Sequence, residues 1–154
     1  MYITLLNKVL QMNKQTDKNI GLIPDTNWII NIVENQGPLS RTINKFRKSK
    51  LKIIIPKFVL HETKKIRGYS ELETINKLQS CLPGKINVVT INQDVMESAK
   101  ELEEKYARLH FPDSIILAYG RMCAYTILSY DHGLLDSAIK EGVQTFTPKK
   151  GGLG

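Results

Sequence analysis

Short apolar runs alternate along the chain with longer stretches in which apolar residues recur every third or fourth position. Runs with the length of buried strands lie at residues 20–24, 51–56, 85–90, 124–129 and 143–147. Continuous apolar runs, of which LKIIIP is the clearest, are typical of strands that are buried on both faces of a parallel sheet. The pattern therefore predicts strands at these positions.

The stretches between these runs have the periodicity of amphipathic helices. In the clearest of them, residues 92–109, apolar side chains share one face and charged side chains lie opposite. Further helices are expected at residues 27–35, 39–50, 57–68, 70–81, 113–123 and 133–142. Because strands and helices alternate, we expect an α/β fold, a three-layer α/β/α sandwich with a five-stranded, mainly parallel sheet.

The two ends of the chain depart from this pattern. Residues 1–12 are apolar at positions that share one face of a short helix, and they lack the basic start and cleavage site of a signal peptide. We expect a helical extension and linker at 1–19, one domain at 20–147 and a flexible tail at 148–154. The extension would pack either on its own domain or on a second copy of the chain, forming a homodimer.

The net charge of the chain favours polyanionic partners. The chain of 154 residues has 22 lysines and arginines against 15 acidic residues, a net charge of +7 and a pI near 9.4. We favour nucleic acid over an anionic membrane as the partner of such a protein, although many basic proteins bind neither. Cys81 and Cys123 form no disulfide or zinc pattern, and no apolar run approaches a membrane span. We therefore expect a cytoplasmic protein without a membrane partner.

Four acidic residues stand where strands end or on apolar helix faces. Asp25 follows the first strand and Asp131 follows the fourth, Glu62 lies on an apolar helical stripe, and Asp113 opens a nearly all-apolar helix. The carboxyl ends of parallel strands meet at one edge of the sheet, where ligands bind. We therefore expect these side chains to converge.

Each acid also has a simpler interpretation. Asp25 and Asp131 could cap helices, Asp113 could complement a helix dipole, and Glu62 could pair with a basic residue. Together, however, four carboxylates at one edge repel each other unless a cation lies among them. Oxygen ligands without histidine or cysteine suit Mg²⁺ or Mn²⁺.

Four segments, taken together, resemble the PIN domain, a family of metal-dependent ribonucleases that includes the VapC-type toxins of toxin–antitoxin pairs. These segments are LIPDTNWII, PKFVLHE, FPDSIILA and ILSYDHGLL. The resemblance covers roughly residues 20–147. It implies a five-stranded parallel sheet, an acidic pocket, RNA as the substrate, an antitoxin protein as a partner if the chain is a toxin, and a homodimer.

The resemblance also assigns roles, since the family's acidic positions fall on Asp25, Glu62, Asp113 and Asp131. Asp25, Asp113 and Asp131 would hold one Mg²⁺ or Mn²⁺, directly or through water. Glu62 would bind the metal or take a proton from the attacking water. Thr26 and Ser129 match hydroxyl positions that orient the ligands, and Asn27 matches the opening motif of aspartate, hydroxyl residue and small polar residue.

The chain departs from many relatives at Gly133, where they carry a further acid. A second metal is therefore left open, as is a catalytically degenerate PIN domain that binds RNA or a protein without cutting. Candidates for holding the RNA backbone are Lys57, Arg67, Arg108 and Arg121, although solvated surface suits each of them better. Trp28, Tyr106 and Tyr119 could stack on bases, but their apolar positions fit the core better.

Other enzymes with a catalytic aspartate fit less well. A phosphatase of the DxD type needs a second acid at the position that Asn27 occupies. A receiver domain needs an acidic pair ahead of the first strand's aspartate, and the chain has Leu-Ile-Pro there. The sequence therefore favours a metal-dependent endoribonuclease.

Overall fold

The computed structural model describes residues 19–35, 45–46, 50–81 and 84–147. Its five strands form one sheet in the order β3-β2-β1-β4-β5, and every neighbouring pair is parallel. The strands are β1 (Asn19–Pro24), β2 (Lys50–Pro56), β3 (Lys85–Val89), β4 (Thr126–Leu128) and β5 (Thr145–Phe146). The predicted α/β class is confirmed, and the described sheet is entirely parallel.

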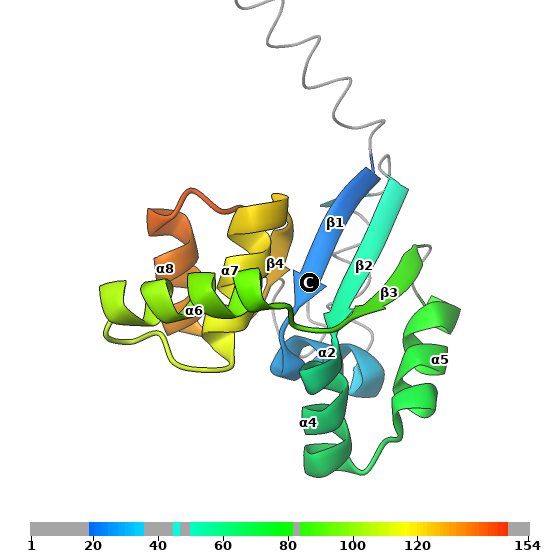
Figure 1. Cartoon of the computed structure of the whole chain (residues 1–154). Coiled ribbons are helices and arrows are strands. Elements are labelled where there is room, and N and C mark those ends of the chain that lie inside the picture. The colour runs from blue at the N-terminus through cyan, green and yellow to red at the C-terminus, as the bar shows by residue number, and fades with distance from the viewer. Residues whose placement is uncertain (1–18, 36–44, 47–49, 82–83, 148–154) are drawn as a thin grey trace, which may run out of the picture.

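Helices connect the strands in two groups (Figure 1). In the described residues these helices are α2 (Thr26–Glu34), α4 (Lys57–Arg67), α5 (Glu71–Cys81), α6 (Gln93–Lys105), α7 (Asp113–Cys123) and α8 (His132–Lys140). The first three pack on one another, and α7 packs against both α6 and α8. The strand order reverses direction after β3, so right-handed crossovers place the two groups on opposite faces of the sheet. This arrangement is the predicted three-layer sandwich.

The core lies on both faces of the central strands. Ile53, Ile54 and Ile55 of β2 are almost completely buried, as are two apolar residues on each neighbouring strand: Leu22 and Ile23 of β1, and Ile127 and Leu128 of β4. Burial of a large aliphatic side chain stabilises the fold by roughly 1.5–3 kcal/mol. The continuous apolar runs in the sequence therefore reflect strands that have no solvent-facing side.

Several element boundaries differ from the prediction, and the backbone shows the cause of two of the differences. The helix expected at residues 92–109 ends at Lys105, because Tyr106 adopts an extended backbone. Leu109 is nevertheless buried, so the apolar periodicity continues past the end of the helix. The strand expected at 124–129 is shorter, because Ala124 has a left-handed φ of 56° and ends α7 just before β4.

Several expectations fall on other parts of the chain. The N-terminal extension, the C-terminal tail and most of the basic helix expected at 39–50 lie outside the described residues. The proposed domain boundaries and the homodimer therefore stay predictions, and light scattering would measure the mass of the assembly. In the part that is described, no helix has the length and apolar character needed to cross a membrane.

Candidate active site

The carboxyl ends of β1 and β4 lie side by side in the sheet. The chain runs outward from β1 to β3 and then returns to place β4 on the other side of β1. Pro24 pairs with Leu128 in the parallel register, and the Asp25 N–H donates to the Leu128 carbonyl at 3.0 Å. The chain leaves β1 through Asp25 and leaves β4 through Ser129 and Asp131. The topology therefore delivers two carboxylates to one edge, at the position where ligands bind in open parallel sheets.

Asp25 caps α2 with one oxygen and accepts a second hydrogen bond with the other. Its Oδ1 accepts the Trp28 N–H at 2.8 Å, and its Oδ2 accepts the hydroxyl of Ser129. The side chain is buried, with 5% of its surface exposed. Capping is therefore one part of its role, and the hydrogen bond from Ser129 fixes the remaining oxygen at the sheet edge.

Ser129 links Asp25 to Asp131. Its buried hydroxyl donates to Asp25 and accepts the N–H of Asp131 at 3.0 Å. Asp131 in turn caps α8, because its Oδ1 accepts the Leu134 N–H at 2.8 Å. Each of the two aspartates thus has one oxygen on a helix N-terminus, so neither carboxylate is free to rotate.

Glu62 reaches the same edge from α4. Its Oε1 accepts the hydroxyl of Thr26 at 2.8 Å, so among the described residues this hydrogen bond comes from a neutral side chain rather than a basic one. Phe58 and Ile66 lie one turn before and after it and line the same cavity. The apolar stripe inferred from the helical spacing therefore faces this cavity.

Asp113, in the first turn of α7, completes the group of acids. A cavity of about 260 Å³ is lined by Asp25, Thr26, Asn27, Phe58, Glu62, Ile66, Pro112, Asp113, Ile116 and Asp131. Burial raises the pKa of Asp113 to about 7, and the charges of Asp131, Asp25 and Glu62 add to the effect. Burial also raises the pKa of Asp25, although the hydrogen bonds from Ser129 and Trp28 oppose the change.

The donor set fits a hard divalent cation. The cavity offers carboxylate oxygens and no histidine or cysteine, and a bound cation would favour the charged forms that burial and the neighbouring acids disfavour. In the described residues no three acidic, histidine or cysteine side chains already close around an ion position. Mg²⁺ keeps several of its waters in proteins. Some acids would therefore hold an ion directly and others through water.

Gly133 lies in a tight environment beside Asp131. A Cβ at Gly133 would lie 3.1 Å from the carbonyl oxygen of Arg108 and 3.3 Å from Asp131 Oδ1. These distances are tighter than ordinary contacts, so a larger residue would displace the chain at Arg108. The local packing at this position therefore suits a glycine.

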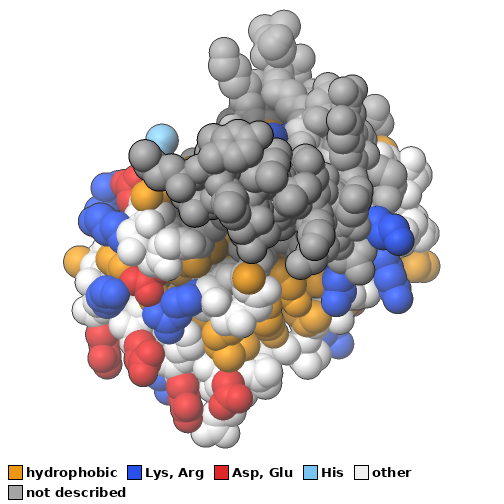
Figure 2. All heavy atoms as spheres, turned by 90° about the horizontal axis from the view of Figure 1, so that it is seen from above, with side chains coloured by type: hydrophobic (Ala, Val, Ile, Leu, Met, Phe, Trp, Pro, Cys, Tyr) orange, Lys and Arg blue, Asp and Glu red, His pale blue; other side chains and the backbone are white. Residues whose placement is uncertain are grey.

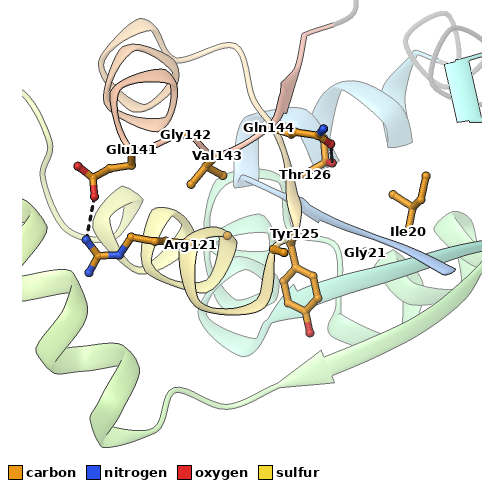
Figure 3. A pocket seen from close by; sticks show the side chains of 11 residues that line it. Ile20, Gly21, Arg121, Tyr125, Thr126, Glu141, Gly142, Val143 and Gln144 are labelled. Atoms are coloured by element: carbon orange, nitrogen blue, oxygen red, sulfur yellow. Dashed lines mark hydrogen bonds and ion pairs between the residues drawn. The ribbon is translucent and has the colours of Figure 1, made fainter. Parts of the chain in front are cut away.

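The four basic residues considered for holding the RNA backbone differ in their surroundings. Lys57 and Arg108 are exposed, and Arg67 pairs with Glu34 on α2 at 3.0 Å. Arg121 lines a different cavity of about 540 Å³ (Figure 3), where it donates to Glu141 at 2.8 Å and to Ser98 at 2.6 Å. The structure therefore does not bring Arg121 to the acidic cavity.

The cavity of Figure 3 lies at the amino ends of the strands, since Ile20 and Gly21 of β1 and Thr126 of β4 line it. Its acidic residue, Glu141, is held by Arg121 and Lys105. Hydrogen bonds from Lys105 and Tyr106 lower the pKa of Glu141 to about 2. This larger cavity therefore has a paired carboxylate rather than a group of competing ones, and we take the smaller cavity as the candidate active site.

The three aromatic residues considered for base stacking do not line the acidic cavity, and Trp28 and Tyr119 are buried as their apolar positions suggested. Trp28 is fully buried, Tyr106 donates to Glu141, and the Tyr119 hydroxyl donates to the carbonyl of Thr90 at 2.6 Å. The aromatic rings at the cavity are Phe58, which lines it, and Phe111, which precedes Pro112 and contacts Phe58. Their positions, four residues before Glu62 and two before Asp113, are the signal in the sequence that could have identified them.

An Asp113→Asn substitution tests the electrostatic state of the cavity. The pKa of Asp113 in the folded protein, about 7, exceeds the ordinary 3.8. The stability that its protonated form contributes is therefore present below about pH 3.8 and lost as the pH rises through 7. The amide should raise the free energy of unfolding of the metal-free protein at pH 8 by about 1–2 kcal/mol, a value reduced for solvent screening. Urea unfolding in EDTA at pH 5 and pH 8 measures this gain, which should be larger at pH 8; the same difference at both pH values would contradict it.

Solved structures share this fold at low sequence identity. VapBC2 from Rickettsia felis, bound to a DNA fragment from the promoter of its genes, matches with a TM-score of 0.63 and 12% identity, over 84% of this chain and 100% of that chain. DNA-bound VapBC from Salmonella typhimurium matches with a TM-score of 0.56 and 11% identity, over 83% and 98%. A domain of a functionally unknown protein from Methanocaldococcus jannaschii matches with a TM-score of 0.53 and 17% identity, over 86% and 93%.

Sequence comparison gives the family. No curated protein sequence matches the chain at a significant level. The family model of the PIN domain matches residues 22–140, which include all four acids of the cavity. This range is well over half of the chain, and the parallel sheet has the architecture expected of that family. The chain therefore belongs to the PIN domain family.

Proposed function

We propose that this protein is an endoribonuclease that depends on Mg²⁺ or Mn²⁺ and cleaves RNA phosphodiester bonds in the acidic cavity. The observation that carries the proposal is the convergence of Asp25, Glu62, Asp113 and Asp131 on one cavity at the carboxyl edge of the sheet. A purely structural role would explain the two capping aspartates. It would not explain why Asp113 and Glu62 approach them, since burial and, after it, the charges of the other acids raise the pKa of Asp113.

Asp25, Asp113 and Asp131 would hold the ion. When bound, a divalent cation lowers the pKa of a coordinated water and offsets the negative charge that builds up on the phosphate. Asp25 and Asp131 are suited to this role because each is oriented by a helix N-terminus and by Ser129. Asp113 is suited to it because its charge is uncompensated in the metal-free cavity.

Glu62 would take the proton from the attacking water. Thr26 donates to Oε1, which leaves Oε2 with its lone pairs for that water. The water oxygen would bond to phosphorus while the bond from phosphorus to the 3′ oxygen breaks, and the 3′ oxygen would gain a proton. This sequence leaves a 5′-phosphate and a 3′-hydroxyl.

The charge distribution supports an approach of RNA over α4. This helix carries Lys57, Lys64, Lys65 and Arg67 beside Glu62, whereas α6 is rich in glutamate. Figure 2 views the molecule from the amino ends of the strands, the face opposite the acidic cavity; acidic side chains gather on its left half with lysines and arginines among them, and further lysines and arginines lie on its right. Lys65, one helical turn after Glu62, is the basic residue that helical geometry places nearest the cavity-facing stripe. A polyanion would therefore lie across the first group of helices rather than along α6.

Incubation of the full chain with single-stranded RNA, in Mn²⁺ or Mg²⁺ and in EDTA, tests the proposal. We expect metal-dependent internal cleavage that leaves 5′-phosphate ends, which a 5′-phosphate-dependent exonuclease then degrades. Cleavage that persists in EDTA, or products with 2′,3′-cyclic phosphates, would contradict the mechanism.

A finer proposal is that the chain is the toxin of a toxin–antitoxin pair, with an antitoxin protein as its partner. Its support is the likeness of the fold to two solved VapBC assemblies. Expression in a bacterial host should then arrest growth in the wild type and not in an Asp25→Asn variant. The product of an adjacent short reading frame should relieve the arrest; unchanged growth with the wild type would contradict the toxin role.

A further inference from the structure

We infer that Phe58 and Phe111 form a stacking platform for one unpaired base of a single-stranded RNA, next to the phosphate held in the acidic cavity. This inference rests on the proposed function, since it assigns the class of substrate that the same cavity takes. It names two residues to which the sequence alone assigned no contact with a substrate.

The platform adjoins the acids directly. Phe58 lines the cavity together with Asp25, Glu62 and Asp113, and the Phe111 ring lies 6.3 Å from the Phe58 ring, between centroids, at an interplanar angle of 36°. Phe111 is joined through Pro112 to Asp113. A phosphate placed at the acids would therefore have its neighbouring nucleotide beside these rings.

The exposure of Phe111 is unusual for its size. The side chain is 58% exposed, whereas Phe58 is half-buried and packs against the core. One ring is thus anchored and the other presents surface to solvent. A planar apolar ring beside a polar cavity is the arrangement on which unstacked bases are held in RNA-binding proteins.

The small size of the patch favours a base over a protein segment. Among the other large hydrophobic side chains that the described residues expose, only Ile66 lines the same cavity. The remaining ones do not line it; they are Leu72, Val88, Met122 and Ile139. An amphipathic helix or an apolar strand would need a longer continuous surface. A single base needs one exposed ring and its neighbour.

The two rings would also favour single-stranded RNA over duplex RNA. In an A-form duplex both faces of each base are covered by stacking, so a ring can reach a base only where the strand is unpaired. Duplex RNA would therefore gain nothing from Phe111. The platform would make cleavage depend on strand structure without reading a base sequence, since every base has a π face.

Three substitutions at Phe111 separate stacking from apolar contact. Phe111→Trp keeps an aromatic face, Phe111→Leu keeps apolar surface without one, and Phe111→Ala removes both. Ile139→Ala is the matched control, because Ile139 is 65% exposed near the end of α8 and belongs to neither cavity. Melting curves establish that each variant folds.

Two readouts keep this inference distinct from the proposed function. Quenching of 2-aminopurine in a short single-stranded RNA, recorded by stopped flow with Mg²⁺ before cleavage, reports stacking. The rate of cleavage in Mn²⁺ reports the nuclease. We expect quenching with the wild type, Ile139→Ala and Phe111→Trp, and its loss with Phe111→Leu and Phe111→Ala. For single strands, kcat/KM should fall roughly 5- to 100-fold in those two variants.

Equal quenching by every variant, or none by the wild type, would overturn the platform. Loss in Phe111→Ala together with retention in Phe111→Leu would also overturn it, in favour of an apolar contact of the kind a protein partner makes. A wild type that fails to cleave with metal would overturn the nuclease proposal, while quenching that depends on the ring at position 111 would still support the platform.

Discussion

An Asp25→Asn protein is expected to fold normally and to lose RNA cleavage by at least about a hundredfold. Asparagine caps helices about as well as aspartate, and its oxygen can still accept the Trp28 N–H. The substitution therefore keeps the capping hydrogen bond and removes the charge that an ion requires, while the amide nitrogen can only donate to the hydroxyl of Ser129 instead of accepting from it. Cleavage of single-stranded RNA in Mn²⁺, with a melting curve beside it, measures both properties.

Asp136→Asn is the matched control for this experiment. Asp136 is exposed on α8 and does not line the acidic cavity, so its loss should leave cleavage unchanged. Glu62→Gln and Asp113→Asn should resemble Asp25→Asn, and combinations should cost little more, because the acids act as a unit. Wild-type rates in all three single variants would show that the carboxylates are structural, and the nuclease proposal would have to be withdrawn.

Mn²⁺ is expected to raise the melting temperature of the wild type, and to do so more at pH 8 than at pH 6. An ion that binds only the folded state stabilises it. Because the pKa of Asp113 is raised to about 7, the ion must displace a proton at pH 6, which lowers its affinity by up to about tenfold and its stabilisation by up to about 1.4 kcal/mol. Thermal melts in Mn²⁺ and in EDTA at the two pH values measure the difference.

The Asp113→Asn variant supplies the control, since its amide has no proton to displace. Its response to Mn²⁺ should be small and nearly the same at both pH values. A wild-type response that grows as the pH falls would assign the binding to groups other than these carboxylates.

The fold could be predicted because its signal is local. The apolar runs of β1, β2 and β4 identify buried strands, and alternation with helices predicts a parallel sheet. Periodicity does not identify a helix end, however, when burial continues beyond it. Leu109 shows this, since it is buried in the segment that follows α6.

The convergence of the four acids could be predicted from the sequence, because the carboxyl ends of parallel strands lie at one edge of the sheet. The sequence could not predict which hydroxyl group forms a hydrogen bond with which acid. The contact between Ser129 and Asp25 depends on the register of β4 against β1, and that between Thr26 and Glu62 depends on how α4 packs on α2.

Sequence patterns did not reveal two features of the structure. These are contacts between residues far apart in the chain and apolar residues that are exposed. Arg121 was a candidate for holding RNA, but its partner Glu141 lies twenty residues away and holds it at the opposite edge of the sheet. Sequence patterns assigned Phe111 no role, because its exposure results from the packing of the segment before α7.

Calorimetric titration of Mn²⁺ into the wild type, Asp136→Asn and Asp25→Asn at pH 8 tests most directly whether these carboxylates form a metal site. The account predicts binding of one ion per chain in the wild type and in Asp136→Asn, and a loss of that binding in Asp25→Asn. Equal affinity in Asp25→Asn, or no binding by the wild type at millimolar Mn²⁺, would contradict it.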